Sequence, residues 1–145
     1  MRKAEKISTN FYDCEVLTKE LFDSGAKVED YVCAEIIAVA QHLRTKFGRI
    51  DINTWYWGGS SQYRGFRPQD CPIGAKRSAH KSGLALDLIF KDTTPIEVQK
   101  YIKANQKEFY DLGLRRIESA LITKTWLHID CKDVGKKDSI YIFNP

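Results

Sequence analysis

The sequence of 145 residues contains no apolar run of the length that a membrane-spanning helix needs. It has four cysteines, none paired at the C-x-x-C spacing of redox motifs and zinc fingers. The amino terminus is charged and is not followed by an apolar segment, so no secretory signal is visible. We therefore expect reduced thiols, residence in the cytoplasm and no membrane partner.

The basic residues are not clustered. Lysine and arginine total 23 against 19 acidic residues, and the net charge of +4 is spread along a chain with no long basic block. A nucleic-acid-binding protein would show clustered basic residues and salt-dependent binding. We expect no nucleic-acid partner, although a mildly basic surface suits polyanions such as cell walls.

The chain also has no obvious linker, internal repeat or low-complexity segment. Its length fits one domain over residues 1–145. Hydrophobic spacing predicts helices at 14–23, at 28–47 and from Pro95 to about 112. Alternation predicts strands at 50–57, 83–90, 114–118, 125–131 and 139–143, with a long loop at 58–74. These elements favour an α+β fold with helices packed on a small, mainly antiparallel sheet.

Histidine is scarce, and its placement carries the strongest functional signal. Two of the three histidines, His80 and His128, lie in the segments Ser78–Asp87 and Trp126–Asp130. With Asp87 they can supply three protein ligands to zinc and leave one position open, as catalytic zinc sites do. Mixed nitrogen and oxygen donors suit zinc better than calcium or magnesium. The alternative is that each histidine is a satisfied structural residue.

Strand alternation places further residues around this site. Ala85 and Asp87 share one strand face, and His128 and Asp130 share another. Asp130 then either contacts the site directly, as a catalytic group, or holds a neighbouring ring in place. Gly83 allows the chain to turn between His80 and the strand.

These residues resemble the zinc D,D-peptidase family, which includes D-Ala-D-Ala carboxypeptidases and phage L-alanyl-D-glutamate endopeptidases. The family pattern S-x-H-x-x-G-x-A-x-D is followed downstream by a W-x-H strand. The resemblance implies the fold shared with the Hedgehog signalling domain, and zinc ligation by His80, Asp87 and His128. Matching positions are Ser78, His80, Gly83, Ala85, Asp87, Trp126, His128 and Asp130, with weaker similarity at residues 7–11, 52–59 and 65–67.

The sequence departs from the family where a general base is expected. Several members carry that base two or three residues before the last histidine, where this chain has Thr125 and Trp126. In a hairpin of 114–118 and 125–131, Glu118 falls roughly opposite these two residues, within reach of the zinc site. Glu118 is therefore the candidate base, with Asp130 as the second candidate. A surface carboxylate paired with a neighbouring arginine is the alternative for Glu118.

Two residues are expected to contact substrate. By the resemblance, an arginine before the first ligand holds a peptide carboxylate; Arg67 occupies that place, and Arg64 in the same loop is the alternative. A guanidinium binds carboxylates through two parallel hydrogen bonds. Ser78 resembles a serine that contacts substrate near the metal. A solvated loop position is the alternative for Arg67.

The sequence thus predicts a monomeric zinc metallopeptidase that hydrolyses peptide bonds in peptidoglycan stem peptides. It would be a phage-type endolysin or a wall-remodelling enzyme, phage-encoded in its host cell and acting on the wall after release. The alternative is a zinc-containing cell-wall or peptide-binding module without turnover, which the missing base at Thr125 and Trp126 permits. Carboxypeptidase and endopeptidase modes both stay open.

Overall fold

The computed structural model describes residues 2–144 and has a mixed α+β architecture. The expected α+β class, with helices on a mainly antiparallel sheet, is confirmed. Within these residues no helix is long and apolar enough to cross a membrane. The helices are α1 (Lys19–Asp23), α2 (Ala34–Phe47), α3 (Pro95–Ala104) and α4 (Gln106–Leu112), and the strands are β1 (Ile50–Asp51), β2 (Ala85–Phe90), β3 (Arg116–Glu118), β4 (Leu127–Asp130) and β5 (Tyr141–Phe143).

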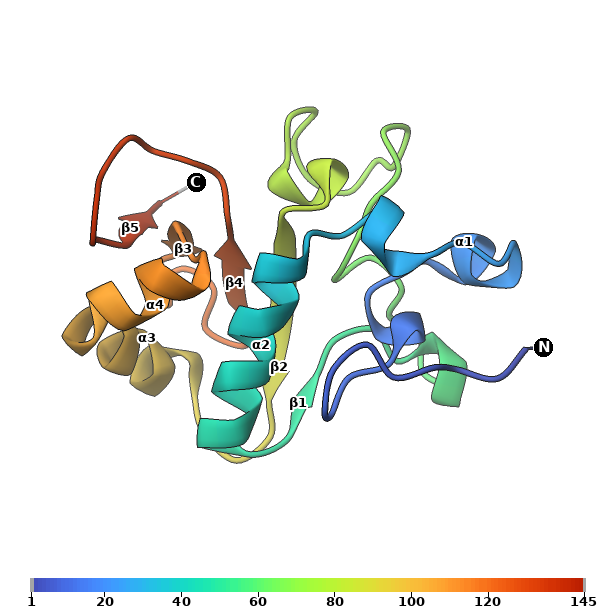
Figure 1. Cartoon of the computed structure of the whole chain (residues 1–145), viewed down its shortest axis with the longest axis horizontal. Coiled ribbons are helices and arrows are strands. Elements are labelled where there is room, and N and C mark those ends of the chain that lie inside the picture. Colours follow the sequence, from blue (N-terminus) through green and yellow to red (C-terminus); the bar gives the residue numbers. More distant parts are fainter. Residues whose placement is uncertain (1, 145) are drawn as a thin grey trace.

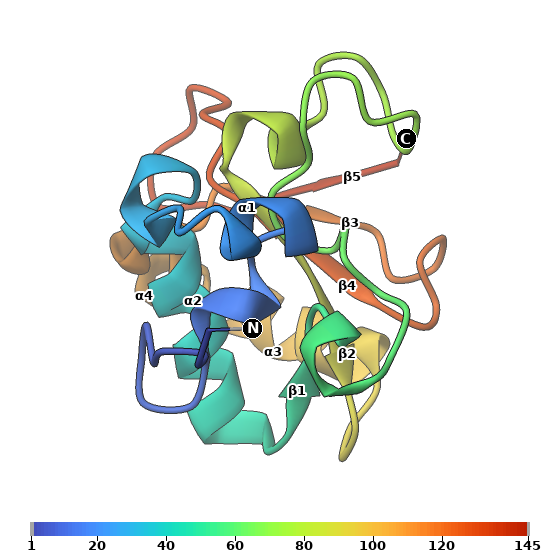
Figure 2. The ribbon, with the colours of Figure 1, turned by 90° about the vertical axis from the view of Figure 1, so that its right-hand side faces the viewer.

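The five strands form one sheet in the order β1-β2-β4-β3-β5, and Figure 2 shows them side by side in that order. Neighbours are antiparallel except β3 and β5, which are parallel. The central register places Asp87 opposite His128 and Arg116 opposite Asp130. Because residues paired across strands point to the same side, this register decides which side chains meet.

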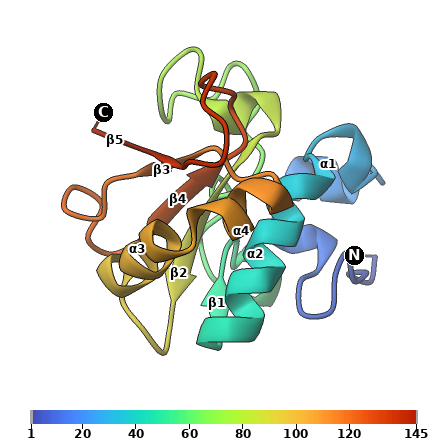
Figure 3. The same cartoon turned by 60° about the vertical axis from the view of Figure 1, so that its left-hand side comes forward.

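One face of the sheet is apolar and covered by helices. Figures 1 and 3 show α2, α3 and α4 together on this side of the strands. Burial of these alternating side chains forms the core that holds the sheet against the helices. The strand residues fully or almost fully buried there are Leu86, Leu88, Ile117, Leu127 and Ile129.

The opposite face carries polar side chains. These side chains alternate along each strand with the core residues. They are Asp87 on β2, His128 and Asp130 on β4, and Arg116 and Glu118 on β3. Three of them are buried, with Asp130 fully so. A buried polar face needs a partner for each charged group, which makes it the place to look for function.

All three predicted helices are shorter or divided in the structure. The segment predicted as a helix over 14–23 is helical as α1 only from Lys19, after a 3-10 turn at Asp13–Glu15. The segment predicted as a helix over 28–47 is helical as α2 only from Ala34, after a short 3-10 turn at Val28–Asp30. The predicted helix from Pro95 to 112 starts as expected, with the Thr94 side chain accepting from the Glu97 amide. It breaks at Asn105, whose side chain donates to the Tyr101 carbonyl oxygen, and continues as α4.

The predicted strand over 50–57 is wrong beyond Asp51. Residues Trp55–Trp57 form a 3-10 turn that ends at Gly58, with φ of +93°. The rings of Trp55 and Tyr56 pack edge-on against Phe22 at 5.3 and 5.6 Å between centroids. The aromatic pattern that resembled a strand therefore serves packing against the N-terminal segment instead.

Candidate metal centre

His80 is held by a tight turn that leads into β2. The Ser78 side chain accepts a hydrogen bond from the His80 amide at 3.3 Å and caps a 3-10 turn over Ala79–Ser82. Gly83 ends the turn with φ of +72°, and a Cβ at this position would collide with the Tyr31 carbonyl oxygen. The need for glycine is therefore both conformational and steric.

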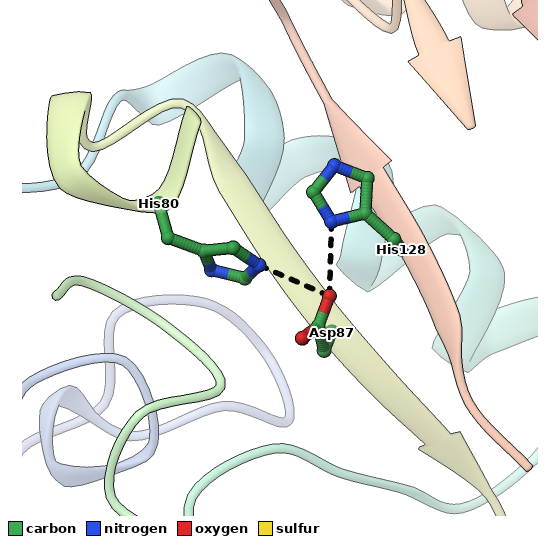
Figure 4. A group of neighbouring side chains, drawn as sticks. All are labelled: His80, Asp87 and His128. Atoms are coloured by element: carbon green, nitrogen blue, oxygen red, sulfur yellow. Dashed lines mark hydrogen bonds and ion pairs between the residues drawn. The ribbon is translucent and has the colours of Figure 1, made fainter. Parts of the chain in front are cut away.

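Asp87 and His128 meet because β2 and β4 pair them directly. Figure 4 shows His80, Asp87 and His128 pointing toward one another from the turn, β2 and β4. Asp87 Oδ1 lies 3.1 Å from His80 Nε2 and 3.0 Å from His128 Nδ1. The structure thus brings together the three predicted ligands, from positions up to 48 residues apart.

The three donor atoms are spaced as the ligands of a zinc ion would be. One atom from each of the three residues lies within 4.8 Å of the others. Zinc bonds of about 2.0 to 2.1 Å in a tetrahedron separate ligand atoms by roughly 3.3 Å. The two measured distances are within a few tenths of an ångström of that value. Two imidazoles and a carboxylate are donors that zinc accepts, and they leave a fourth position open.

Each ligand is also held by its remaining polar atom. His80 Nδ1 lies 2.8 Å from the Gly65 carbonyl oxygen, to which it donates, so Nε2 is free to face a metal. His128 Nε2 lies 2.7 Å from Asp130 Oδ2, so Nδ1 is free in the same way. Partners of this kind fix the ring orientation of metal-binding histidines.

Asp130 holds a neighbouring ring, that of His128, which is the second of the two roles considered for it. Its side chain is fully buried and contacts His128 and Arg116, and it is not part of the group of three donor atoms. Hydrogen bonds with His128 and Arg116 outweigh the effect of burial and lower the pKa of Asp130 below its ordinary value. A carboxylate held in this way is suited to orient the His128 ring, and the catalytic role of Asp130 stays a prediction.

Arg67 contacts a ligand instead of standing free in the loop. Its Nη2 lies 3.2 Å from Asp87 Oδ2, and its Nε donates to the Tyr63 carbonyl oxygen at 2.7 Å. The side chain is about nine-tenths buried. The guanidinium therefore holds the third ligand as Gly65 and Asp130 hold the other two. Binding of a substrate carboxylate by Arg67 stays a prediction that must rely on Nη1.

The cluster is strongly polarised. Burial alone would raise the pKa of Asp87, but hydrogen bonds from His128 and His80 hold it well below its usual range. Burial alone would lower the pKa of His128, but hydrogen bonds with Asp130 and Asp87 raise it to about 9. The ligand carboxylate is therefore charged at neutral pH, and a metal must displace a proton from His128.

Glu118 shares the face of the cluster, but its partner on β4 lies two to three residues from where the sequence placed it. Continuing the β3–β4 register by one residue sets Glu118 opposite His128, not opposite Thr125 and Trp126. Its carboxylate is partly exposed, and burial together with nearby Asp87 raises its pKa while His128 lowers it. A carboxylate with a raised pKa beside a metal cluster is a suitable proton acceptor and donor.

Open space borders the turn that carries His80. A hollow of about 360 Å³ there is lined by Gln69, Lys76, Arg77, Ser78, Ala79, Ser82, Leu84 and Lys132. A larger hollow of about 830 Å³, between the N-terminal segment and the start of α2, contains none of the cluster residues. The smaller hollow is not lined by a cluster residue either, but it borders the turn that carries His80, through Ser78 and Ala79.

Sequence reasoning missed three participants: the Gly65 carbonyl, Arg116 and Phe143. A backbone carbonyl leaves no trace in residue types. Arg116 is one of many basic residues, and only its register opposite Asp130 distinguishes it. Phe143 comes to the site through parallel pairing of β5 with β3, a long-range contact that alternation alone does not predict.

Comparisons with known proteins add no family. No family model matches the chain, and neither a curated protein nor a solved structure matches it. What can be said of the site therefore rests on its own geometry.

Proposed function

We propose that the protein is a zinc-dependent peptidase that hydrolyses peptide bonds in peptidoglycan stem peptides. The observation that carries this proposal is the convergence of His80 Nε2, Asp87 Oδ1 and His128 Nδ1, each from a side chain whose other polar atom is already held. Preorganised ligands with an open position are typical of catalytic rather than structural zinc sites.

The residues have separable roles. Zinc bound by the three ligands would supply Lewis-acid activation of water and of a peptide carbonyl. Glu118 would accept the proton of the attacking water and pass it to the leaving amine, for which its raised pKa suits it. Ser78 would contact the substrate through its hydroxyl hydrogen, since its oxygen already accepts from the His80 amide.

The substrate class rests on the sequence resemblance. The chain carries the S-x-H-x-x-G-x-A-x-D pattern and the later W-x-H strand of the zinc D,D-peptidases. The α+β architecture is compatible with the Hedgehog/D,D-peptidase fold of that family. Lys76, Arg77 and Lys132 line the hollow that borders the His80 turn and would attract the carboxylates of stem peptides.

A binding module without turnover is the second candidate. Neither Thr125 nor Trp126 can act as a base, and both carboxylate oxygens of Asp130 are bound by neighbouring residues. Glu118 is then the acid on which catalysis depends. A chain in which Glu118 does not serve as the base would bind zinc and peptide without hydrolysing it.

The test is release of new amines from purified peptidoglycan by the zinc-loaded protein. We expect release by the wild type and none by His80→Ala, which loses a ligand. Glu118→Gln keeps the shape of the side chain and should retain zinc, while its rate falls roughly 10²- to 10⁴-fold, the usual contribution of a general base. The expected deficit of Glu118→Gln should be absent in Glu97→Gln, which changes an exposed glutamate on α3.

Two results would redirect the proposal. Stoichiometric zinc in a wild type that releases no amine would favour the binding module. Full activity of Glu118→Gln would show that another group, or none, transfers the proton.

A further inference from the structure

Arg116 makes the most extensive ionic contact on the polar face of the sheet, yet no role has been assigned to it. Its Nε lies 3.0 and 3.1 Å from the two carboxylate oxygens of Asp130, and its Nη2 lies 2.9 Å from Oδ2. The β3–β4 register sets the two residues directly opposite each other. A guanidinium that binds both oxygens fixes the plane of the carboxylate as well as its position.

The contact continues from Asp130 to a metal ligand. Asp130 Oδ2 lies 2.7 Å from His128 Nε2, and Asp130 Oδ1 also accepts from the Lys132 amide at 3.0 Å. Asp130 has no exposed surface. Its carboxylate therefore has one orientation, in which Oδ2 meets the imidazole.

Phe143 completes the enclosure from the neighbouring strand. The Arg116 guanidinium carbon lies 4.3 Å from the centre of the Phe143 ring. The same ring meets His128 edge-on, at 5.8 Å between centroids and 89° between planes. Phe143 thus touches both the arginine and the histidine, and β5 holds it there by parallel pairing with β3.

We propose that Arg116 and Phe143 are positioning residues that, through Asp130, make Nδ1 the metal-binding nitrogen of His128. This inference rests on the proposed zinc site and does not depend on what the site hydrolyses. Arg116 aligns Asp130, and Asp130 holds Nε2–H. Phe143 blocks rotation of the ring and supports the arginine.

The physical reason is that an imidazole offers two similar nitrogens. Rotation of the ring by half a turn would exchange the edges that face Asp87 and Asp130, so a metal could be met by the wrong nitrogen or by carbon. A fixed acceptor on one side removes this alternative before the metal binds. Loss of such partners typically weakens metal binding 10- to 100-fold.

The test measures the zinc dissociation constants of the wild type, Arg116→Met and Arg115→Met by chelator competition. The two arginines are sequence neighbours and half-buried, and both substitutions remove one positive charge. Arg115 instead contacts Tyr110 and the Leu114 carbonyl, away from the cluster. We expect zinc binding about 10- to 100-fold weaker in Arg116→Met and within about threefold of wild type in Arg115→Met.

A second readout separates positioning from general destabilisation. Imidazole nitrogen NMR of the zinc-loaded wild type should show metal on Nδ1 and a proton on Nε2 of His128. Arg116→Met and Phe143→Leu should broaden or split these signals. Arg116→Lys keeps the charge without the two-point contact, so it should recover part of the affinity and serve if Arg116→Met does not fold.

The outcomes are distinguishable from those for the peptidase proposal. Equal zinc affinity in Arg116→Met and Arg115→Met, with His128 signals unchanged, would overturn the positioning role even if the protein hydrolyses peptides. Tight zinc binding that depends on Arg116, in a protein that releases no amine, would support the positioning role and leave the peptidase proposal overturned. A wild type that binds no zinc would overturn both.

Discussion

Leu127 and Ile129 lie on one face of β4, and His128 and Asp130 lie on the other. All four are buried, so burial alone does not separate them. The first pair packs against apolar neighbours, where total volume and shape decide the energy. The second pair contacts named polar atoms, each at a hydrogen-bond distance.

The two faces therefore tolerate change differently. Apolar side chains of similar size can replace one another in a core with a modest loss of stability. On the polar face no buried side-chain nitrogen or oxygen among residues 2–144 lacks a partner. Removal of one member leaves another charge buried and unpaired, which costs more than the contact itself contributed. The apolar face stabilises the fold, and the polar face lowers part of that stability because its buried charges must be desolvated and paired.

The largest expected effect comes from Asp87→Asn on the polar face. Asp87 Oδ1 is the atom that both histidines contact, and its negative charge is what a zinc ion would neutralise. The amide keeps the shape but not the charge, so we expect zinc affinity to fall by more than the roughly 10- to 100-fold that loss of a supporting partner costs, because a ligand itself is lost. Chelator competition measures this loss.

A control and a contradicting result follow from the same strand. Leu88→Val on the opposite face of β2 should leave zinc affinity within about threefold of wild type, because it changes only core volume. Zinc binding by Asp87→Asn within tenfold of wild type would show that Asp87 is not a ligand, and the comparison of faces would lose its basis.

The next effect is expected from Ile129→Ala on the core face. Ile129 is fully buried and pairs with Leu86 and Ile117. Truncation should lower the free energy of unfolding by about 2 to 5 kcal/mol. Zinc affinity of the folded protein should change little. Urea denaturation of the zinc-free chain gives the first value, and a loss below 1 kcal/mol would contradict the assignment of this face as core.

The two faces also differ in how well the sequence predicted them. Period-two alternation identified β2 and β4, because apolar side chains at every second position are enough to define the core face. It failed at residues 52–57, where Trp55 and Tyr56 satisfy the same pattern but pack on Phe22. Burial of an aromatic ring can be met in several ways, so alternation over a few residues is weak support for a strand.

On the polar face, residue type predicted the ligands but not their supports. His80, Asp87 and His128 could be chosen because histidine is scarce and two of the three histidines lie in segments that also carry an aspartate. Their supports depend on a backbone carbonyl, on the β3–β4 register and on a loop that folds Arg67 back onto Asp87. The predicted position of Glu118 differed because a hairpin's register depends on its turn, which the sequence specifies poorly.

The last expected effect is a change with pH, and it has opposite signs for the metal-free fold and for the site. The pKa of His128 is raised from 6.5 to about 9 by hydrogen bonds with Asp130 and Asp87, against the effect of burial. A group with a raised folded-state pKa stabilises the fold fully below its unfolded pKa and loses this contribution as pH rises through the folded value. The zinc-free chain should therefore lose stability between about pH 6.5 and 9.

Zinc affinity should rise over the same interval. The metal binds only the neutral ring of His128, in which Nδ1 carries no proton, and the carboxylate of Asp87, whose pKa is held low, is already charged. We expect affinity to increase by up to about tenfold per pH unit and to level off above about pH 9. Urea denaturation of the zinc-free chain and chelator competition at pH 6.5, 7.5 and 8.5 measure both trends. Ile129→Val should lower the stability curve without changing its slope, because the core face holds no titrating group. Curves for stability and zinc affinity that are both flat from pH 6.5 to 8.5 would mean that His128 is not protonated in the metal-free fold.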